Sequence, residues 1–218
     1  MAGSRKKEAV ILVHGLIRSR ASMLIIGTYL KMKGYIPVYF PYHSTTRPIC
    51  IHAAKLAQFT AKFAKNHPDT VLHFVTHSLG GIIAREALAM LEEKSLKAVK
   101  QFGRMVMTAP PNRGSARANI LSENRILSEW IKPLDELRTP QNSYIHTVRT
   151  PKSLEIGIIS GRFDGKVKPY EAELDEAVEH ITINAMHTFI MNSPAARKAV
   201  LSFLKYGTFS KKSTRNTQ

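Results

Sequence analysis

Ser78 has the sequence context of a reactive serine. It lies in the segment from Thr76 to Gly81 (THSLGG), between an apolar segment, Val71–Thr76, and a helix-like segment, Ile82–Leu91. A serine on a sharp turn between a strand and a helix projects its hydroxyl above the sheet. The small residues Gly80 and Gly81 suit a place where the strand and helix backbones approach closely. Ser78 is therefore the candidate nucleophile.

A serine hydroxyl is a weak nucleophile and needs a base. His187 follows the last predicted strand, Ile181–Ile183, and precedes the last predicted helix, so we expect it at the rim of the sheet. His77 faces the opposite way if Ser78 faces the site, and we expect it only to support the site. The other histidines rank lower as the base: His43, His52, His67, His73, His146 and His180.

The base in turn needs an acid that fixes its tautomer. Asp164 lies in Gly161–Gly165 (GRFDG), directly after the predicted strand Leu154–Ser160. Glu171 is the reserve candidate, because it could also reach the rim. We interpret the neighbouring acids Glu173, Asp175, Glu176 and Glu179 as a solvated face.

The oxyanion that develops during acyl transfer needs two preorganised donors. The backbone N–H of Leu79, directly after the nucleophile, is one candidate, and the helix N-terminus there favours negative charge. The backbone N–H of Leu16 is the other, in the loop that follows His14-Gly15. We expect His14 to fix this loop, with Gly15 as a further supporting residue.

The elements that must position these residues alternate between strands and helices. Continuous apolar strands predict a parallel sheet that is buried on both faces, and sites in such sheets lie at the carboxyl ends of the strands. We expect about six strands, with helices on both faces and a small helical cap. The predicted strands are Ala9–Val13, Ile36–Phe40, Val71–Thr76, Arg104–Ala109, Leu154–Ser160 and Ile181–Ile183, and the helices are Ser22–Lys33, Ile51–Lys65, Ile82–Leu91 and one that begins at Ser193-Pro194.

Four blocks of the sequence resemble the α/β-hydrolase superfamily, in particular bacterial lipases and esterases. They are Leu12–Leu16 (LVHGL), Val75–Gly81 (VTHSLGG), Ala109–Ser115 (APPNRGS), and the pair Phe163–Val167 (FDGKV) and Met186–Met191 (MHTFIM). The chain order Ser78, Asp164, His187 is also that of these enzymes. The resemblance implies a serine hydrolase with no metal and no organic cofactor. One position departs from the pattern, because Thr76 stands where the family has the first glycine of Gly-x-Ser-x-Gly.

The 218 residues suit a single domain. We expect residues 115–150 to form a cap or lid, and residues 207–218 to form a flexible basic tail. Leu127, Trp130, Ile131 and Leu134 fall at the spacing of one helical stripe, so Trp130 and Leu134 are candidate substrate-binding residues. Ordinary packing of a cap helix explains the stripe equally well.

The net charge is +16, from 32 basic and 16 acidic residues. We interpret the excess as a solvated basic surface that could also contact an anionic membrane peripherally. No zinc-finger spacing or RNA-binding signature is present, so nucleic acid is not expected as a partner. The single cysteine, Cys50, excludes an internal disulfide and a cysteine-cluster metal site. Without a secretory signal or a transmembrane stretch, a cytoplasmic setting is expected.

The sequence therefore predicts hydrolysis of a carboxylic ester, with a small acyl ester or lipid as substrate, through an acyl-enzyme intermediate. Two alternatives remain open: a thioesterase or acyltransferase on the same fold, and a catalytically silent module that binds through its basic surface. The acyl chain length and the oligomeric state cannot be read from these residues.

Overall fold

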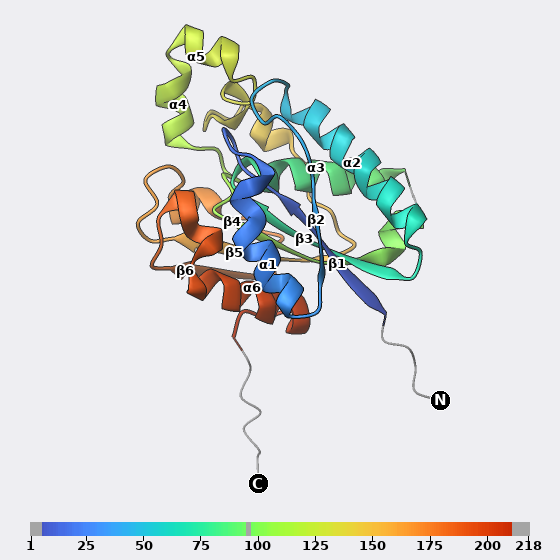
Figure 1. Ribbon diagram of the computed structural model, residues 1–218. Helices are drawn as coiled ribbons and strands as arrows, with labels where there is room; N and C mark the ends of the chain where they lie inside the picture. The colour runs from blue at the N-terminus through green and yellow to red at the C-terminus, as the bar shows by residue number, and fades with distance from the viewer. Residues whose placement is uncertain (1–5, 95–96, 211–218) are drawn as a thin grey trace, which may run out of the picture.

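The computed structural model describes residues 6–94 and 97–210, and its described residues form one sheet of six parallel strands (Figure 1). The spatial order is β2-β1-β3-β4-β5-β6, and every neighbouring pair is parallel. This confirms the predicted fold class. The strands are β1 (Lys7–Val13), β2 (Ile36–Tyr39), β3 (Thr70–His77), β4 (Phe102–Thr108), β5 (Glu155–Gly161) and β6 (Glu179–Ile183).

Helices cover both faces of this sheet, as continuous apolar strands require. Figure 1 shows α2 and α3 against one face and α1 and α6 against the other. The α-helices are α1 (Leu24–Met32), α2 (Ile49–Asn66), α3 (Leu79–Glu93), α4 (Ala116–Ser122), α5 (Arg125–Trp130) and α6 (Pro194–Tyr206). The 3₁₀ helices are η1 (Arg20–Met23), η2 (Lys97–Gln101), η3 (Asp135–Leu137), η4 (Tyr144–Thr147), η5 (Pro169–Ala172) and η6 (His187–Asn192). None of the helices described is both long and apolar enough to cross a membrane.

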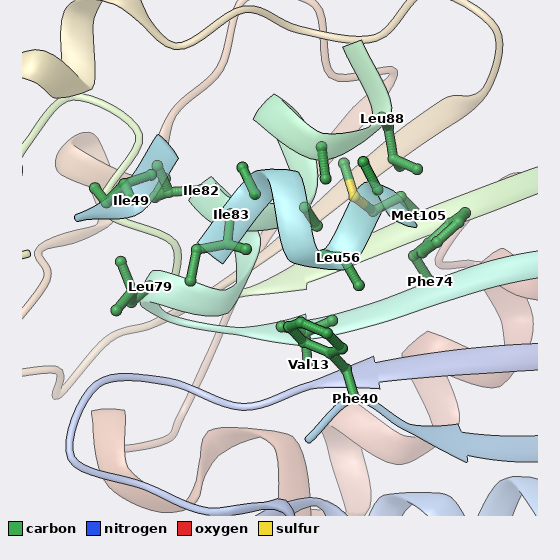
Figure 2. Packing of buried hydrophobic residues seen from close by; sticks show 14 of the residues in the cluster. Val13, Phe40, Ile49, Leu56, Phe74, Leu79, Ile82, Ile83, Leu88 and Met105 are labelled. Atoms are coloured by element: carbon green, nitrogen blue, oxygen red, sulfur yellow. The ribbon is translucent and has the colours of Figure 1, made fainter. Parts of the chain in front are cut away.

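The core consists of two large clusters of buried side chains, one on each face of the sheet. The cluster under α2 and α3 includes Leu56 of α2, Phe74 of β3 and Met105 of β4, all of which are fully buried (Figure 2). The cluster under α1 and α6 includes Leu30 and Phe203. Burial on both faces explains why the central strands read as continuous apolar runs rather than alternating ones.

The strand order places a crevice beside the first and third strands. After β1 the chain crosses to β2 on one side, and it then returns to place β3 on the other side of β1. The loops that leave the carboxyl ends of β1 and β3 therefore diverge, and such a switch point is where parallel sheets bind ligands. His14-Gly15 and Ser78 follow these two strand ends.

Two segments differ from those expected in ways that affect the site or the core. Helix α3 begins at Leu79 rather than at Ile82, because Gly80 and Gly81 are helical residues here rather than helix breakers. Residues 207–210 are also not a loose tail. Phe209 is buried against Phe203, with ring centroids 4.8 Å apart, and its N–H donates to Glu179 at 2.7 Å. Residues 211–218 of the predicted tail lie outside the described residues.

The segment expected to form a cap contains two short α-helices, α4 and α5, and the 3₁₀ helices η3 and η4. Arg85 of α3 holds both ends of this segment. Its guanidinium is buried and donates to the side chain of Asn112 at 2.9 Å and to the main-chain oxygen of Val148 at 2.8 Å. The segment is thus attached to the sheet through α3 at its beginning and at its end.

Candidate active site

Ser78 occupies a strained position between β3 and α3. Its backbone has φ 52° and ψ −127°, a conformation that residues with a side chain rarely adopt. The Ser78 N–H donates to the Thr108 oxygen at the end of β4, at 2.9 Å. This bond and the two flanking elements hold the serine in the sharp turn that its sequence context predicts.

Close backbone contacts require glycine around this turn. A Cβ on Gly80 would lie 2.6 Å from the Val13 oxygen of β1, and a Cβ on Gly15 would lie 3.0 Å from the Ser78 Cβ. Thr76, which departs from the family pattern, fits because position 81 carries no side chain. A Cβ on Gly81 would lie 3.2 Å from the Thr76 hydroxyl oxygen. The bulk added at position 76 therefore fills space that Gly81 leaves open.

Ser78, His187 and Asp164 form one continuous line of hydrogen bonds. The His187 Nε2 lies 3.0 Å from the Ser78 Oγ, and the His187 Nδ1 lies 2.7 Å from the Asp164 Oδ2. Because the carboxylate accepts from Nδ1–H, Nε2 is left free to accept the serine proton. The structure thus brings the three predicted residues together in an arrangement that can activate a serine hydroxyl.

The Asp164 carboxylate is buried and fixed from two sides. While Oδ2 faces His187, Oδ1 accepts from the backbone N–H groups of Lys166 and Val167, both at 2.8 Å. Such bonds offset the cost of burying a carboxylate. The Ser115 hydroxyl donates to the Lys166 oxygen at 2.6 Å and so attaches the same loop to the beginning of α4.

Glu171, the reserve acid, serves a structural purpose instead. Its carboxylate is buried and accepts from the Ala116 N–H at 2.7 Å and from the Lys168 N–H at 2.6 Å. Both oxygens are therefore engaged in joining the loop after β5 to the first residue of α4. This leaves Asp164 as the carboxylate that contacts His187.

His77 lies behind the site, as expected, and contacts the base through its backbone. Its Nε2 is 2.9 Å from the His187 oxygen. Because a carbonyl oxygen only accepts, Nε2 must carry the proton. Burial, with a smaller effect from the neighbouring His187, lowers the pKa of His77 to about 3. His77 is thus a neutral donor that helps to fix the segment carrying His187.

The loop after β1 is held by three side chains. The Tyr42 hydroxyl donates to the His14 oxygen at 2.6 Å, and the two rings stack with centroids 4.3 Å apart. The His14 Nε2 lies 3.2 Å from the Tyr42 oxygen, and burial lowers the pKa of His14. The Ser44 hydroxyl accepts from the N–H of Ile17 at 2.9 Å, where φ is 54°. His14 therefore fixes the loop rather than facing the serine.

The two residues whose N–H groups are the predicted oxyanion donors both lie near the serine. Leu79 is the first residue of α3, so its N–H belongs to the donors that a helix leaves without an intrahelical partner. Leu16 lines the same pocket as Ser78. No motif in the sequence indicates the supporting roles of Tyr42 and Ser44. The position of Tyr42 directly after a strand is the signal that points to this segment.

A pocket of about 350 Å³ opens beside Ser78 and His187. Its apolar lining comes from the loops after β1, β4 and β5, from α4, and from η3 with the residue before it. The residues of this lining are Leu16, Ile17, Pro111, Ala118, Leu121, Leu134, Leu137 and Val167. Clefts of this size and polarity suit a small apolar ligand group.

The two substrate-binding candidates have different positions. Leu134 is buried and lines the pocket, whereas Trp130 is 78% exposed and lies outside the lining. The expected continuous helical stripe is wrong, because α5 ends at Trp130. Pro133 explains this end: proline lacks the N–H that a helix needs, and its ring clashes with the carbonyl one turn earlier.

The remaining histidines lie away from the line of hydrogen bonds. The His73 Nδ1 accepts from the Arg104 N–H at 3.0 Å, and the His180 Nε2 lies 2.9 Å from the Ser160 hydroxyl. His52 is buried on α2, and His146 contacts the Thr139 oxygen. Within the described residues, no three histidine, cysteine or carboxylate side chains gather as they would around a metal ion.

The parallel six-stranded sheet, with a serine turn after the third strand, has the α/β-hydrolase fold. A family model described as "Putative serine esterase (DUF676)" matches residues 4–110. No curated protein matches the chain in sequence.

Solved structures share the fold at low sequence identity. The mature lipase BlEst2 of Bacillus licheniformis is 18% identical, with a TM-score of 0.77, and the match covers 94% of each chain. A metagenomic carboxyl esterase, MGS0156, is 18% identical, with a TM-score of 0.67 over 84% of this chain and 65% of the other. A type II thioesterase of the yersiniabactin pathway, YbtT, is 17% identical, with a TM-score of 0.60 over 95% and 96%.

Proposed function

We propose that the protein is a serine esterase that cleaves carboxylic esters with an apolar acyl group. The observation that carries the proposal is the line of hydrogen bonds from Ser78 through His187 to Asp164, which lies beside an apolar pocket. The match to a family described as serine esterases and the structural likeness to a lipase and a carboxyl esterase support the same class.

In the proposed reaction the Ser78 Oγ attacks the ester carbonyl while the His187 Nε2 takes the hydroxyl proton. The N–H groups of Leu79 and Leu16 donate to the oxyanion of the tetrahedral intermediate. His187 then gives its proton to the departing alcohol, which leaves the acyl group on Ser78. A water molecule, deprotonated by His187, attacks this acyl-enzyme and releases the carboxylic acid and the free serine.

Asp164 keeps His187 in the productive tautomer. Its Oδ2 accepts from Nδ1–H throughout, and its negative charge stabilises the imidazolium that forms after each proton transfer. The two backbone N–H bonds to Oδ1 keep the carboxylate oriented without blocking Oδ2. Peripheral membrane contact through the basic surface remains a prediction and is not needed for this chemistry.

A fluorophosphonate probe tests the proposal directly. We expect the probe to label the wild type and Ser202→Ala, but not Ser78→Ala. Ser202 is a suitable control because it lies on α6 and its hydroxyl has no partner among the described residues. Hydrolysis of p-nitrophenyl esters, from acetate to palmitate, should disappear in Ser78→Ala alone.

Failure of the folded wild type to react with the probe would overturn the proposal and favour the silent binding module. Circular dichroism and a thermal melt of each variant show that loss of labelling does not come from loss of fold. Matched acyl thioesters and an added alcohol acceptor, assayed in parallel, separate esterase activity from thioesterase and acyltransferase activity.

A further inference from the structure

The lining of the pocket beside Ser78 is of two chemical kinds. Ala118, Leu134, Leu137 and Val167 are almost fully buried and provide its apolar part. The lining also includes three cationic residues, Arg18, Arg117 and Lys166, of which Arg117 and Lys166 are exposed. Such a lining suits a ligand with one apolar part and one anionic part.

The three cations extend from parts of the chain that are firmly held. The Arg18 guanidinium carbon lies 6.0 Å from the ring centroid of Phe189, which belongs to the same 3₁₀ helix as His187. Arg117 follows Ala116, whose N–H is bonded to Glu171. The backbone of Lys166 is bonded at its N–H to Asp164 and at its oxygen to Ser115. The backbone at Arg117 and Lys166 and the ring beside Arg18 are thus held by residues of the site itself.

No acidic side chain balances these charges at the pocket. The lining contains no aspartate or glutamate, and within the described residues Arg18, Arg117 and Lys166 form no ion pair with a carboxylate. The carboxylates of Asp164 and Glu171 are buried nearby, and their oxygens contact backbone N–H groups and His187 rather than these three side chains. Three cationic side chains and no carboxylate therefore line the pocket.

We propose that the site selects acyl esters whose alcohol part carries an anionic group, such as a phosphate or a carboxylate. The inference rests on the proposed esterase function, since it assigns the substrate of that same site. The acyl chain contacts the buried apolar part of the lining, the carbonyl lies at Ser78, and the anionic alcohol part faces the three cations. Guanidinium and ammonium groups bind phosphate and carboxylate through charge-assisted hydrogen bonds.

A purely solvated basic surface would give a different result. In a protein with 32 basic and 16 acidic residues, cations occur at many places on the surface. Such charges would raise the activity toward anionic esters only through long-range attraction, which salt screens and which every exposed lysine shares. The proposal instead requires that the effect depend on the three residues at the pocket.

The first test compares a neutral substrate with an anionic one. The substrates are 2-nitrophenyl octanoate and 4-octanoyloxy-3-nitrobenzoate, which differ by a carboxylate on the leaving group. We expect the ratio of kcat/KM, anionic over neutral, to fall by about three- to tenfold in each of Arg18→Gln, Arg117→Gln and Lys166→Gln, as loss of a charge-assisted contact predicts. Comparing ratios between variants cancels the intrinsic reactivity of the two leaving groups.

Lys62→Gln is the matched control, since Lys62 is an exposed cation on α2, outside the pocket lining. Its ratio should equal that of the wild type. Equal ratios in all four variants would overturn the proposal while leaving the esterase function intact. Hydrolysis of the neutral ester and fluorophosphonate labelling report on that function separately.

The second test measures binding without turnover. Calorimetry of Ser78→Ala with monomeric octyl phosphate and with octanol should show tighter binding of the phosphate, and Arg117→Gln in the same background should weaken it. Equal affinity for the two compounds would overturn the proposal. Binding seen only with phosphatidylcholine vesicles that contain phosphatidylglycerol would overturn it as well, in favour of a membrane surface rather than a single anionic ligand.

Discussion

The Nε2 of His77 lies 2.9 Å from the main-chain oxygen of His187, and the two rings are 5.0 Å apart at their centroids. The residue directly before the proposed nucleophile thus holds the segment that carries the proposed base. Both histidines are buried, and the Nδ1 of His77 has no partner among the described residues. His77 is therefore a positioning residue that acts on the reaction through the backbone of His187.

Replacing His77 with phenylalanine removes the donor but keeps a ring in the buried space. We expect kcat to fall about tenfold with little change in KM, because a misplaced base affects the chemical step. His77→Gln, whose amide can reach the same oxygen, should recover most of the lost kcat. Steady-state kinetics of both variants checks this, and equal losses in the two would point to packing alone.

Asp164 and Glu171 should respond differently to loss of charge. Asp164→Asn is expected to lower kcat on the order of a thousandfold or more, because an amide favours the wrong tautomer of the base. Glu171→Gln should mainly lower the free energy of unfolding, since its two carboxylate oxygens accept backbone bonds. Paired measurements of kcat and of urea denaturation separate the two roles. A large loss of kcat in Glu171→Gln but not in Asp164→Asn would instead make Glu171 the carboxylate partner of His187.

The positive φ of Ser78 predicts an unusual ranking of two variants. Both Ser78→Ala and Ser78→Gly remove the hydroxyl, which makes no capping bond to α3. Glycine relieves the strain at φ 52°, so Ser78→Gly should be about 1 kcal/mol more stable than Ser78→Ala. Thermal melts of the two inactive proteins provide the comparison. A lower melting temperature for the glycine variant would argue against strain at this turn.

The fold could be predicted from the sequence because local patterns and long-range packing agree. Continuous apolar strands alternate with amphipathic helices, so parallel pairing and two covered faces follow directly. Ser193 illustrates this agreement, since its side chain accepts from the Ala196 N–H and Pro194 follows it at the first helical position. The burial of Phe209 could not be predicted, because a single aromatic residue in a polar segment does not indicate which core residues it packs against.

The candidate site was predictable for a similar reason. Carboxyl ends of parallel strands meet at one edge of a sheet, so residues after β3, β5 and β6 were expected to converge. The supporting contacts were not predictable, because those of Ser44, Ser115 and Arg85 are made across loops far apart in the chain. The course of the chain between Trp130 and Leu134 depends on Pro133, which outweighs the helical spacing of the apolar residues.

Buried neutral histidines should make the protein less stable in mild acid. Burial lowers the pKa of His73 to about 4 and that of His77 to about 3, below the ordinary value of about 6.5 in an unfolded chain. As the pH falls from about 6.5 to 4, the unfolded state therefore binds protons that the folded state does not. The free energy of unfolding should fall by up to about 1.4 kcal/mol per pH unit for each histidine.

Urea denaturation across this pH range measures how steeply the free energy of unfolding falls with pH. His73→Leu should reduce this slope by up to about 1.4 kcal/mol per pH unit, which corresponds to one proton. His67→Leu is the control, since His67 is exposed at the end of α2. An unchanged slope in His73→Leu would show that other groups cause the acid sensitivity.

The pocket predicts which of two apolar residues sets the preference for acyl chain length. Leu134 is buried in the pocket lining, so Leu134→Phe should shift the best p-nitrophenyl ester toward a shorter chain by filling the apolar part of the pocket. Trp130→Ala should leave the profile unchanged, since the tryptophan lies outside the lining. A chain-length series on both variants tests the pair. A shift caused by Trp130→Ala instead would show that α5 closes over the site when substrate binds.

The separation of the three proposed catalytic groups along the chain has a consequence for biosynthesis. A nascent chain folds in order from its N-terminus, and it can complete β1, β3 and β4 around Ser78 before Asp164 and His187 have left the ribosome. The two triad hydrogen bonds span 109 and 23 residues. The serine therefore acquires its base only after β5 and β6 have joined the sheet. The proposed hydrolysis therefore requires the complete sheet, and a chain that ends before β6 should lack it.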